Sequence, residues 1–489
     1  MDHPRLQSLP PSTPTGKKII VIVVDSLLEE PLQTLMAQNR LPAFSFLKEN
    51  GWYTSRAISS FPTMSVSIES TMLTGSYPDK HQIPGLRWYD TRENRLVNYG
   101  DGFFPTLTSG VQQVMEDSLF HLNNTHLNKE VLTIHEELDQ QGKSSASINA
   151  LVYRGTHLQT LRIPAFKDVQ TMAPPYFVLG TFHHSEKTNV GKQYLNSYGV
   201  NDDVSIHHLV QLIKENALPA FTMVYLPDMD HDGHKHGANL TDTVIQTDTR
   251  LQKILNSFGS WEKALQDHVF IVMGDSGVST TIDDRQEAII DLESLFGNWQ
   301  ITKPGNTASG DELALAVNGR MAYVYALQEN IKLTDLTNLA VADPRFDTIS
   351  QKNGEWIEVI QGGTNKQLRF RLGSTYADEF LQKWDIEGDW SVLDLRMDHN
   401  HQIQYGAYPD GLMQLYAAHH SHPGRFMILT TQPGFEVTGE NSPTHVGGGN
   451  HGSFHMVDSY FPMFISGTEK KPKTWRIVDL KSFILDVLK

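Results

Sequence analysis

KIIVIVVDS, residues 18–26, is the stretch that decides the fold of this chain. Six branched aliphatic residues, 19–24, lie between a lysine and a single carboxylate, Asp25. An unbroken apolar run of this length is typical of a strand that is buried on both faces, as in a parallel sheet. A carboxylate at the end of such a strand is costly unless it is paired or bound to a metal. The stretch therefore predicts an α/β fold with a polar site at the carboxyl edge of its sheet.

Segments with strand and helix patterns alternate along the rest of the chain, as in a parallel sheet with crossover helices. Residues 32–51 have helical spacing that ends at Gly51, and residues 65–75 have the pattern of a helix closed by Gly75. Later segments follow the same alternation: a helix at 201–215, a strand at 221–227, a helix at 241–258, a strand at 268–274, and a strand followed by a helix at 460–488. We therefore expect a mostly parallel central sheet flanked by helices.

The composition changes in the second half of the chain, where short β-rich segments such as WIEVIQ and LRFRLG are separated by Gly, Asn and Asp. This pattern indicates a smaller β-rich insertion built on the core. The proline-rich residues before the first strand have the composition of a disordered leader. The predicted parts are a leader (1–17), an α/β core (18–310), an insertion or cap (311–425) and the C-terminal part of the core (426–489).

With 489 residues and a formal net charge of -16, the chain is acidic and long enough for a large core. An acidic surface argues against binding to duplex nucleic acid, whose phosphates require a basic face. The absence of cysteine excludes disulfides and thiolate metal sites. No apolar run approaches the ~20 residues of a membrane span, and the N-terminus shows no apolar signal segment. As it stands, the sequence predicts a cytoplasmic protein, with an extracellular location as the alternative, and leaves the oligomeric state open.

DHDGH, residues 230–234, is the sharpest local signal. Asp230 and His234 are four residues apart, so on a helix or a tightly turned loop both side chains can face one ion. Gly233 is expected to let the backbone turn closely there. The alternative is a polar loop of solvated side chains, in which neighbouring residues compete for the role of ligand: Asp228, His231, Asp232 and His236.

Two aspartates stand at predicted strand ends, Asp25 after IIVIVV and Asp275 after VFIVMG. Each carboxylate suits a metal ion, and the alternative for each is the N-cap of the following helix. Ser65 begins a predicted helix, whose positive end would favour an anion and assist a nucleophilic hydroxyl. The residue pattern does not separate Ser65 from Thr63 or Ser67, any of which could serve as nucleophile or cap.

His451 lies in GGGNHGS, where small neighbours allow the backbone to approach a ligand closely. Imidazole is a natural third zinc ligand beside Asp230 and His234. The alternative is a flexible loop with an incidental histidine, and His445 and His455 compete with His451 for the role.

Taken in order, these segments resemble the alkaline phosphatase superfamily, nearest to its type I phosphodiesterase/nucleotide pyrophosphatase branch. IVVDS is similar to the first strand of that branch, which ends in an aspartate, here Asp25. FPTMS followed by TGSYP keeps the register of the branch's F-P-T-x-T and T-G-x-Y-P, which puts Ser65 at the nucleophile position. DHDGHKHG and GNHGS resemble its P-D-x-x-G-H-x-x-G and G-x-H-G segments. The resemblance covers roughly residues 17–110, 200–300 and 425–489.

The resemblance implies an alkaline-phosphatase-like fold and two divalent metal ions, with zinc expected. One ion would be held at the positions of Asp230, His234 and His451. The other would be held by Asp25, Ser65, Asp275 and a histidine directly after that last aspartate. This chain has Ser276 in place of that histidine. A serine hydroxyl is a poor zinc ligand, so Mn²⁺ or Mg²⁺ is the alternative expectation at this second site.

From the residues and the resemblance we expect a metal-dependent phosphoester hydrolase that acts on a small substrate through a phosphoseryl intermediate on Ser65. A phosphodiesterase or nucleotide pyrophosphatase activity is the first expectation, and a phosphatase or phosphonate hydrolase of the same superfamily is the second. The substitution at Ser276 supports a third hypothesis, a degenerate member that binds metal or ligand without turnover.

Overall fold

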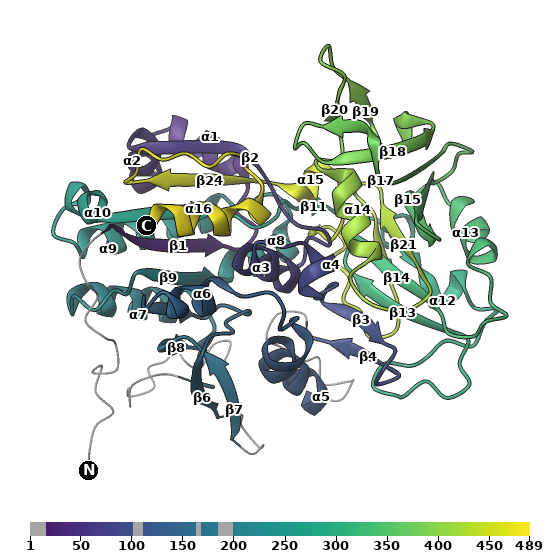
Figure 1. The fold of residues 1–489 in the computed structure, drawn as a ribbon, viewed down its shortest axis with the longest axis horizontal. Helices are drawn as coiled ribbons and strands as arrows, with labels where there is room; N and C mark the ends of the chain where they lie inside the picture. Colours follow the sequence, from purple (N-terminus) through teal and green to yellow (C-terminus); the bar gives the residue numbers. More distant parts are fainter. Residues whose placement is uncertain (1–15, 101–110, 163–167, 184–198) are drawn as a thin grey trace.

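The computed structural model describes residues 16–100, 111–162, 168–183 and 199–489. Residues 1–15 of the expected leader lie outside the described residues. Two large sheets dominate the described part of the chain, one of seven strands and one of nine. Figure 1 shows them at opposite ends of the molecule, with α3 (Ser65–Thr74) and α8 (Asp228–His236) between them.

The seven-stranded sheet forms the α/β core, in the order β2-β24-β10-β1-β9-β5-β8. The five strands from β10 to β8 run parallel, and β24 at the other side is the one strand that runs in the opposite direction, antiparallel to both β10 and the edge strand β2. The strands are β1 (Lys18–Val24), β2 (Gly51–Ile58), β5 (Ser145–Ile148), β8 (Tyr176–Val178), β9 (Phe221–Leu226), β10 (His268–Met273) and β24 (Tyr460–Ser466). The expected mostly parallel sheet is therefore confirmed.

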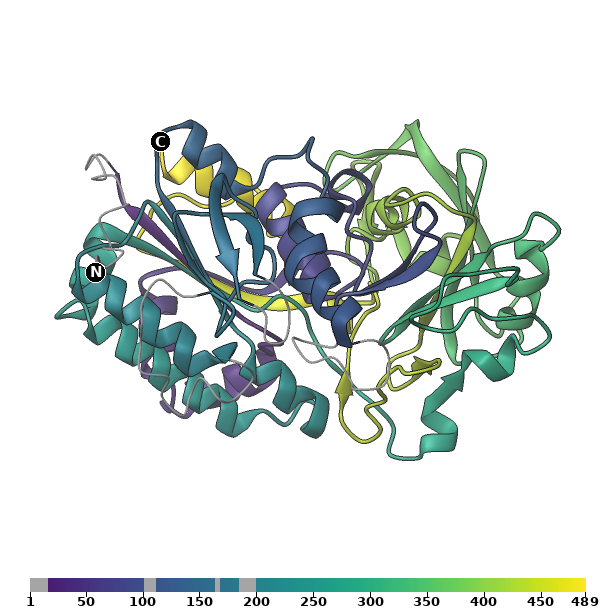
Figure 2. The ribbon, with the colours of Figure 1, turned by 90° about the horizontal axis from the view of Figure 1, so that it is seen from below.

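Both faces of this sheet are covered by helices, because the side chains of β1 alternate between two apolar layers. Ile20, Ile22 and Val24 pack in one layer, under α1 (Glu29–Ala37), α2 (Pro42–Glu49), α7 (Asp202–Lys214) and α9 (Thr241–Asn256). Ile19, Val21 and Val23 pack in the other, under α3, α6 (Ile134–Gln140) and α16 (Leu480–Val487). Figure 2 shows helices on the two sides of the sheet. An unbroken aliphatic strand buries both faces in this way.

Most of the predicted core elements are present, with one break. The helical pattern expected over 32–51 is divided between α1 and α2, because Pro42 lacks a backbone N–H and begins a new helix. Gly51 is the first residue of β2 and ends no helix. The helix expected after Ser65 is α3, and Gly75 closes it in the left-handed conformation, at φ 65°.

The nine-stranded sheet is built from the β-rich second half of the chain. Its strands are β13 (Leu313–Asn318), β14 (Met321–Ala326), β15 (Phe346–Asn353), β16 (Trp356–Gln361), β17 (Gln367–Asp378), β18 (Lys383–Gly388), β19 (Leu395–Met397), β20 (Gln402–Tyr405) and β21 (Phe426–Thr431). β21 lies between β14 and β15, so this sheet also draws on the chain after residue 425. Among the described residues, no helix has the length and apolar character that crossing a bilayer requires.

Candidate active site

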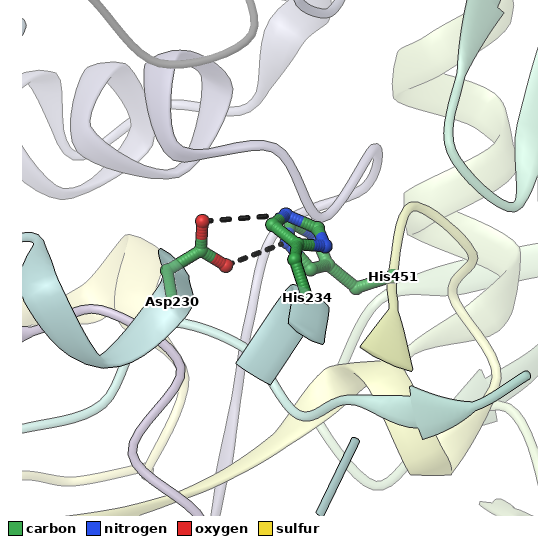
Figure 3. A group of neighbouring side chains, drawn as sticks. All are labelled: Asp230, His234 and His451. Atoms are coloured by element: carbon green, nitrogen blue, oxygen red, sulfur yellow. Dashed lines mark hydrogen bonds and ion pairs between the residues drawn. The ribbon is translucent and has the colours of Figure 1, made fainter. Parts of the chain in front are cut away.

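Asp230, His234 and His451 lie together where α8 meets the loop before α15 (Met456–Ser459) (Figure 3). The two oxygens of Asp230 face two imidazoles: Oδ2 is 3.3 Å from His234 Nε2 and Oδ1 is 3.2 Å from His451 Nε2. One potential ligand atom from each of the three residues lies within 4.8 Å of the others. One carboxylate and two imidazoles at this spacing fit a single zinc ion, with room for a further ligand.

The outer nitrogens of the two histidines are fixed by backbone carbonyls. His234 Nδ1 donates to the carbonyl of Gly449 at 2.8 Å, and His451 Nδ1 donates to the carbonyl of Thr63 at 2.6 Å. Because a carbonyl only accepts, each Nδ1 carries the hydrogen, and each Nε2 faces Asp230 with its lone pair or a second proton. This is the arrangement of metal-ligating histidines, whose other ring nitrogen donates to an outer acceptor.

The electrostatics of this group also suit a cation. Burial lowers the pKa of His234, but the Asp230 carboxylate outweighs it and raises the pKa to about 9. Burial raises the pKa of Asp230, but His234 and His451 outweigh it and hold that pKa well below its usual range. The site therefore stabilises positive charge beside the Asp230 carboxylate. Protonation of the two imidazoles or one divalent ion can supply this charge.

Gly449, unlike Gly233, lies where the backbone geometry requires a glycine. Gly233 lies inside α8, and a Cβ there would meet only Leu240 and Val278 side chains, at 3.9 and 4.0 Å. A Cβ on Gly449 would lie 2.3 Å from Val278 Cγ1 and 2.7 Å from the carbonyl oxygen of Gly233. The expectation that Gly233 permits a close turn is therefore wrong, since α8 continues through it and the close approach occurs at Gly449.

Glu436, at the start of β22 (Glu436–Thr438), holds the loop around the histidines, and the sequence pattern does not reveal it. This fully buried carboxylate accepts from the backbone N–H of His445 at 2.7 Å and from the side-chain amide of Asn450. Asn450 Oδ1 in turn accepts from the backbone N–H of His451 at 2.9 Å. Glu436 is thus connected to the backbone of His451 by hydrogen bonds through one intermediate residue, Asn450.

The other candidates raised by the sequence have different partners. The His445 ring stacks on His234 with centroids 4.1 Å apart, outside the three-residue group. Asp232 accepts from Thr243, and His455 accepts from the backbone N–H of Val457 at the start of α15. Asp228 pairs with Arg250, exposed His231 contacts Lys235, and His236 lies exposed at the end of α8.

Asp25 and Ser65 meet at the end of β1. Ser65 Oγ donates to Asp25 Oδ2 at 3.3 Å, and the hydroxyl of Tyr225, from β9, donates to the same oxygen. Asp275 Oδ1 accepts from the backbone N–H of Ser26 at 3.0 Å. The Ser26 hydroxyl donates to Asp230 Oδ1 at 2.8 Å, so Ser26 links this group to the three-residue group.

The ionised forms of the carboxylates in this second group are unfavourable, because the carboxylates are buried and repel one another. Burial raises the pKa of Asp25 well above its usual range, and the neighbouring Asp275 and Asp230 add to the shift. Burial likewise raises the pKa of Asp275 to about 7, with a contribution from Asp230. Among the described residues, Asp25 Oδ1 and Ser276 Oγ are buried oxygens with no hydrogen-bond partner. These oxygens fit a divalent ion, which would neutralise the charge and give them a partner.

Thr63, Ser65 and Ser67 occupy different environments. The Thr63 hydroxyl donates to the carbonyl of Ser453 at 3.0 Å and accepts from the N–H of Gly452 at 2.8 Å, so it anchors the His451 loop. The Ser67 hydroxyl is buried and donates to the carbonyl of Ile83 at 3.1 Å. Only the Ser65 hydroxyl of these three faces a carboxylate at the candidate site, and Ser65 is partly exposed.

Comparisons with known proteins agree with this architecture. A family model described as type I phosphodiesterase/nucleotide pyrophosphatase matches residues 19–454. Similar solved structures include murine ectonucleotide pyrophosphatase/phosphodiesterase 5, at 14% identity and a TM-score of 0.57. The human protein of the same name gives 13% identity and a TM-score of 0.57. Each alignment covers 96% of this chain and 95% of the other.

An inactive variant of the murine protein, in which a threonine is replaced by alanine, was solved in complex with AMP. It is similar over the same share of both chains, with 13% identity and a TM-score of 0.58. At these identities the structural likeness concerns the fold. No curated protein is a significant sequence match to this chain.

Proposed function

This chain belongs to the type I phosphodiesterase/nucleotide pyrophosphatase family of the alkaline phosphatase superfamily, and we propose that it is a metal-dependent phosphoester hydrolase with Ser65 as its nucleophile. The observation that carries the proposal is the convergence of the Ser65 hydroxyl, Asp25 and the three-residue group Asp230, His234 and His451. Ser26 bonds to Asp230 and Asp275, so the two groups form one continuous site.

In this proposal Asp230, His234 and His451 hold zinc. Asp25, Asp275 and Ser65 hold a second divalent ion, which is zinc or a harder ion such as Mn²⁺ or Mg²⁺. Such ions supply Lewis-acid stabilisation of the phosphoryl charge and lower the pKa of a bound hydroxyl or water. The chain's own residues position the nucleophile and the ligands.

In this proposal Ser65 attacks phosphorus in line with the leaving group, and its hydrogen bond and its position on α3 support that role. Its hydroxyl donates to Asp25, which holds the hydroxyl oriented at the first residue of α3. The positive end of this ten-residue helix favours an anionic phosphoryl group beside Ser65. The Ser65 hydroxyl gives up its proton as Oγ forms a bond to phosphorus, and the bond from phosphorus to the leaving oxygen breaks, so that the leaving group takes up a proton and departs as an alcohol. Water then cleaves the Ser65 phosphoester, which releases a phosphate monoester and restores the hydroxyl. A phosphodiester of the nucleotide type is the proposed substrate, supported by the AMP complex of the murine relative.

The activity test uses the full chain with Zn²⁺ or Mn²⁺ and bis-p-nitrophenyl phosphate. We expect p-nitrophenolate release by the wild type and none by Ser65→Ala. Ser67→Ala is the matched control, because it removes a hydroxyl two residues along the same helix that bonds to Ile83 instead. Undiminished release by Ser65→Ala would contradict the proposal.

The unpartnered hydroxyl of Ser276 supports a second candidate, a family member that binds metal or ligand without turnover. Metal analysis separates the two: two ions per chain favour the hydrolase, and one or none favours the binding protein. Within the hydrolases, a higher rate on p-nitrophenyl phosphate than on the diester would favour a phosphatase.

A further inference from the structure

Asp90, Glu93 and His126 form a separate group of potential metal ligands, outside the candidate active site. One potential ligand atom from each of the three lies within 4.8 Å of the others. They come from the end of β3 (Arg87–Asp90), from the turn before β4 (Arg95–Asn98) and from the end of the π-helix η2 (Asp117–His126). β3 and β4 pair as a hairpin, so the group lies where that hairpin meets η2.

His126 is the residue that distinguishes this group from a cluster of solvated acids. It is only 4% exposed. Its Nδ1 lies 2.8 Å from the hydroxyl of Tyr99, and its Nε2 is buried with no hydrogen-bond partner among the described residues. Because Tyr99 occupies Nδ1, Nε2 is the nitrogen left for an ion. Burial lowers the pKa of His126 to about 3, which keeps the imidazole in the neutral form that binds metal.

Tyr99 gives this imidazole an outer partner. Its oxygen accepts from Trp88 Nε1 at 3.2 Å and has a second lone pair for the hydrogen of His126 Nδ1. In that tautomer Nε2 presents a lone pair, as in histidines that bind a metal through one nitrogen and donate to an outer acceptor through the other.

Arg92 and Arg95 pair with the two carboxylates, but neither pair excludes an ion. Arg92 Nη2 is 3.0 Å from Asp90 Oδ2, and the Arg92 side chain is 67% exposed, so water screens much of this pair. Arg95 pairs with Glu93 and also, at 2.8 Å, with buried Asp117, so it keeps a carboxylate partner when Glu93 binds an ion. Three carboxylates against two guanidiniums leave one negative charge, which the neutral imidazole does not offset. Exposed Glu93 also gives the ion a path from solvent.

We propose that Asp90, Glu93 and His126 form a zinc site that fastens the β3–β4 hairpin to η2. The imidazole favours Zn²⁺ over Mg²⁺ or Ca²⁺, and water completes the coordination of the ion. Asp117, the first residue of η2, already pairs with Arg95 of the hairpin, so the ion adds a second link at the other end of this helix. The proposal is independent of the proposed function, since none of its three ligands belongs to the candidate active site.

Zinc content tests the site in the full chain. Wild type and variants are freed of metal, equilibrated with excess Zn²⁺ and dialysed, and the zinc retained per chain is measured by elemental mass spectrometry. We expect Glu93→Gln and His126→Phe each to retain one zinc ion fewer than the wild type, whatever number the candidate active site holds. Gln keeps an acceptor for Arg95, and Phe fills the space of the imidazole without offering a ligand. Exposed Glu130→Gln is the matched control and should retain the wild-type content.

Zinc should also raise the melting temperature of the wild type by more than that of Glu93→Gln, because an ion that binds only the native state stabilises it. Zinc content equal to the wild type's in Glu93→Gln would overturn the proposal, whatever His126→Phe retains. Should His126→Phe fail to fold, as circular dichroism would show, Glu93→Gln decides alone, since its exposed side chain lies outside the core.

Discussion

At the scale of a single residue, the buried carboxylate of Asp347, outside the candidate site, makes the stability of the fold depend on pH. Its Oδ1 accepts from the hydroxyl of Tyr408 at 2.8 Å and from the side-chain amide of Gln432 at 2.9 Å. Its Oδ2 is buried without a partner among the described residues. Burial raises the pKa of Asp347 to about 6. The native state therefore holds this proton more tightly than the unfolded chain, and it loses stability as pH rises from about 4 to about 6.

Asp347→Asn keeps both accepted hydrogen bonds and removes the charge. We expect this variant to be more stable than the wild type by on the order of 2 kcal/mol at about pH 7, with little difference at about pH 4. Urea unfolding at the two pH values measures this. A stability difference of the same size at both pH values would show that Asp347 has an ordinary pKa.

At the residue scale, the strand-end position of Asp25 and Asp275 is visible in the sequence, because each follows an unbroken apolar run. The role of Tyr225 is not visible in the same way, because its segment has the pattern of an ordinary buried strand. Its contact with Asp25 depends on β1 and β9 being neighbours in the sheet, which local pattern does not determine.

At the element scale, β23 (Gly449–Asn450) and α8 are packed so closely that only glycine fits at position 449. We expect Gly449→Ala to push β23 away from α8 and weaken the bond from His234 to the Gly449 carbonyl. Zinc affinity should fall about tenfold or more, as when an outer partner of a metal ligand is lost. Competition with a chromogenic chelator measures the affinity.

Gly233→Ala is the control for this prediction, because its added methyl group would make only ordinary contacts with the side chains of Leu240 and Val278. Equal zinc affinity of the two alanine variants would contradict the role given to Gly449. The pattern of the chain correctly predicts regular elements such as α7, whose Asn201 cap and periodicity are local, and α3, which Gly75 closes. It does not reveal β23, since a two-residue strand has no periodicity and forms only through its partner β11 (Ser279–Thr280).

At the scale of the whole molecule, Arg320 and Asp458 join the two sheets. Arg320 lies in the turn between β13 and β14, and Asp458 lies in α15 directly before β24. The two side chains form a buried ion pair, and Arg320 Nη2 also donates to the carbonyl of Thr431 at 2.6 Å. We expect Arg320→Met to cost about 3–5 kcal/mol in the free energy of unfolding, because it leaves Asp458 charged, buried and unpaired.

Chemical denaturation measures this cost, and the double variant Arg320→Met with Asp458→Asn should recover part of it. Arg369→Met is the surface control, since the Arg369–Glu387 pair is about half exposed and should contribute less than about 1 kcal/mol. A cost for Arg320→Met as small as the control's would contradict a structural role for the buried pair.

The arrangement of the whole molecule is only partly predictable from the chain. Alternating strands and helices indicate the parallel core, and the change of composition indicates a second, β-rich part. The antiparallel edge formed by β24 and β2 pairs residues more than four hundred positions apart. Pairing over that separation depends on global packing and leaves no local pattern.

The central claim is that Ser65 attacks phosphorus and becomes transiently esterified. Rapid quenching of the metal-loaded full chain with bis-p-nitrophenyl phosphate, followed by mass spectrometry of the peptide that contains Ser65, tests it directly. We predict a burst of p-nitrophenolate and a p-nitrophenyl phosphoryl group on Ser65 that disappears as turnover proceeds. Turnover with Ser65 unmodified at every quench time, and undiminished in Ser65→Ala, would contradict the claim.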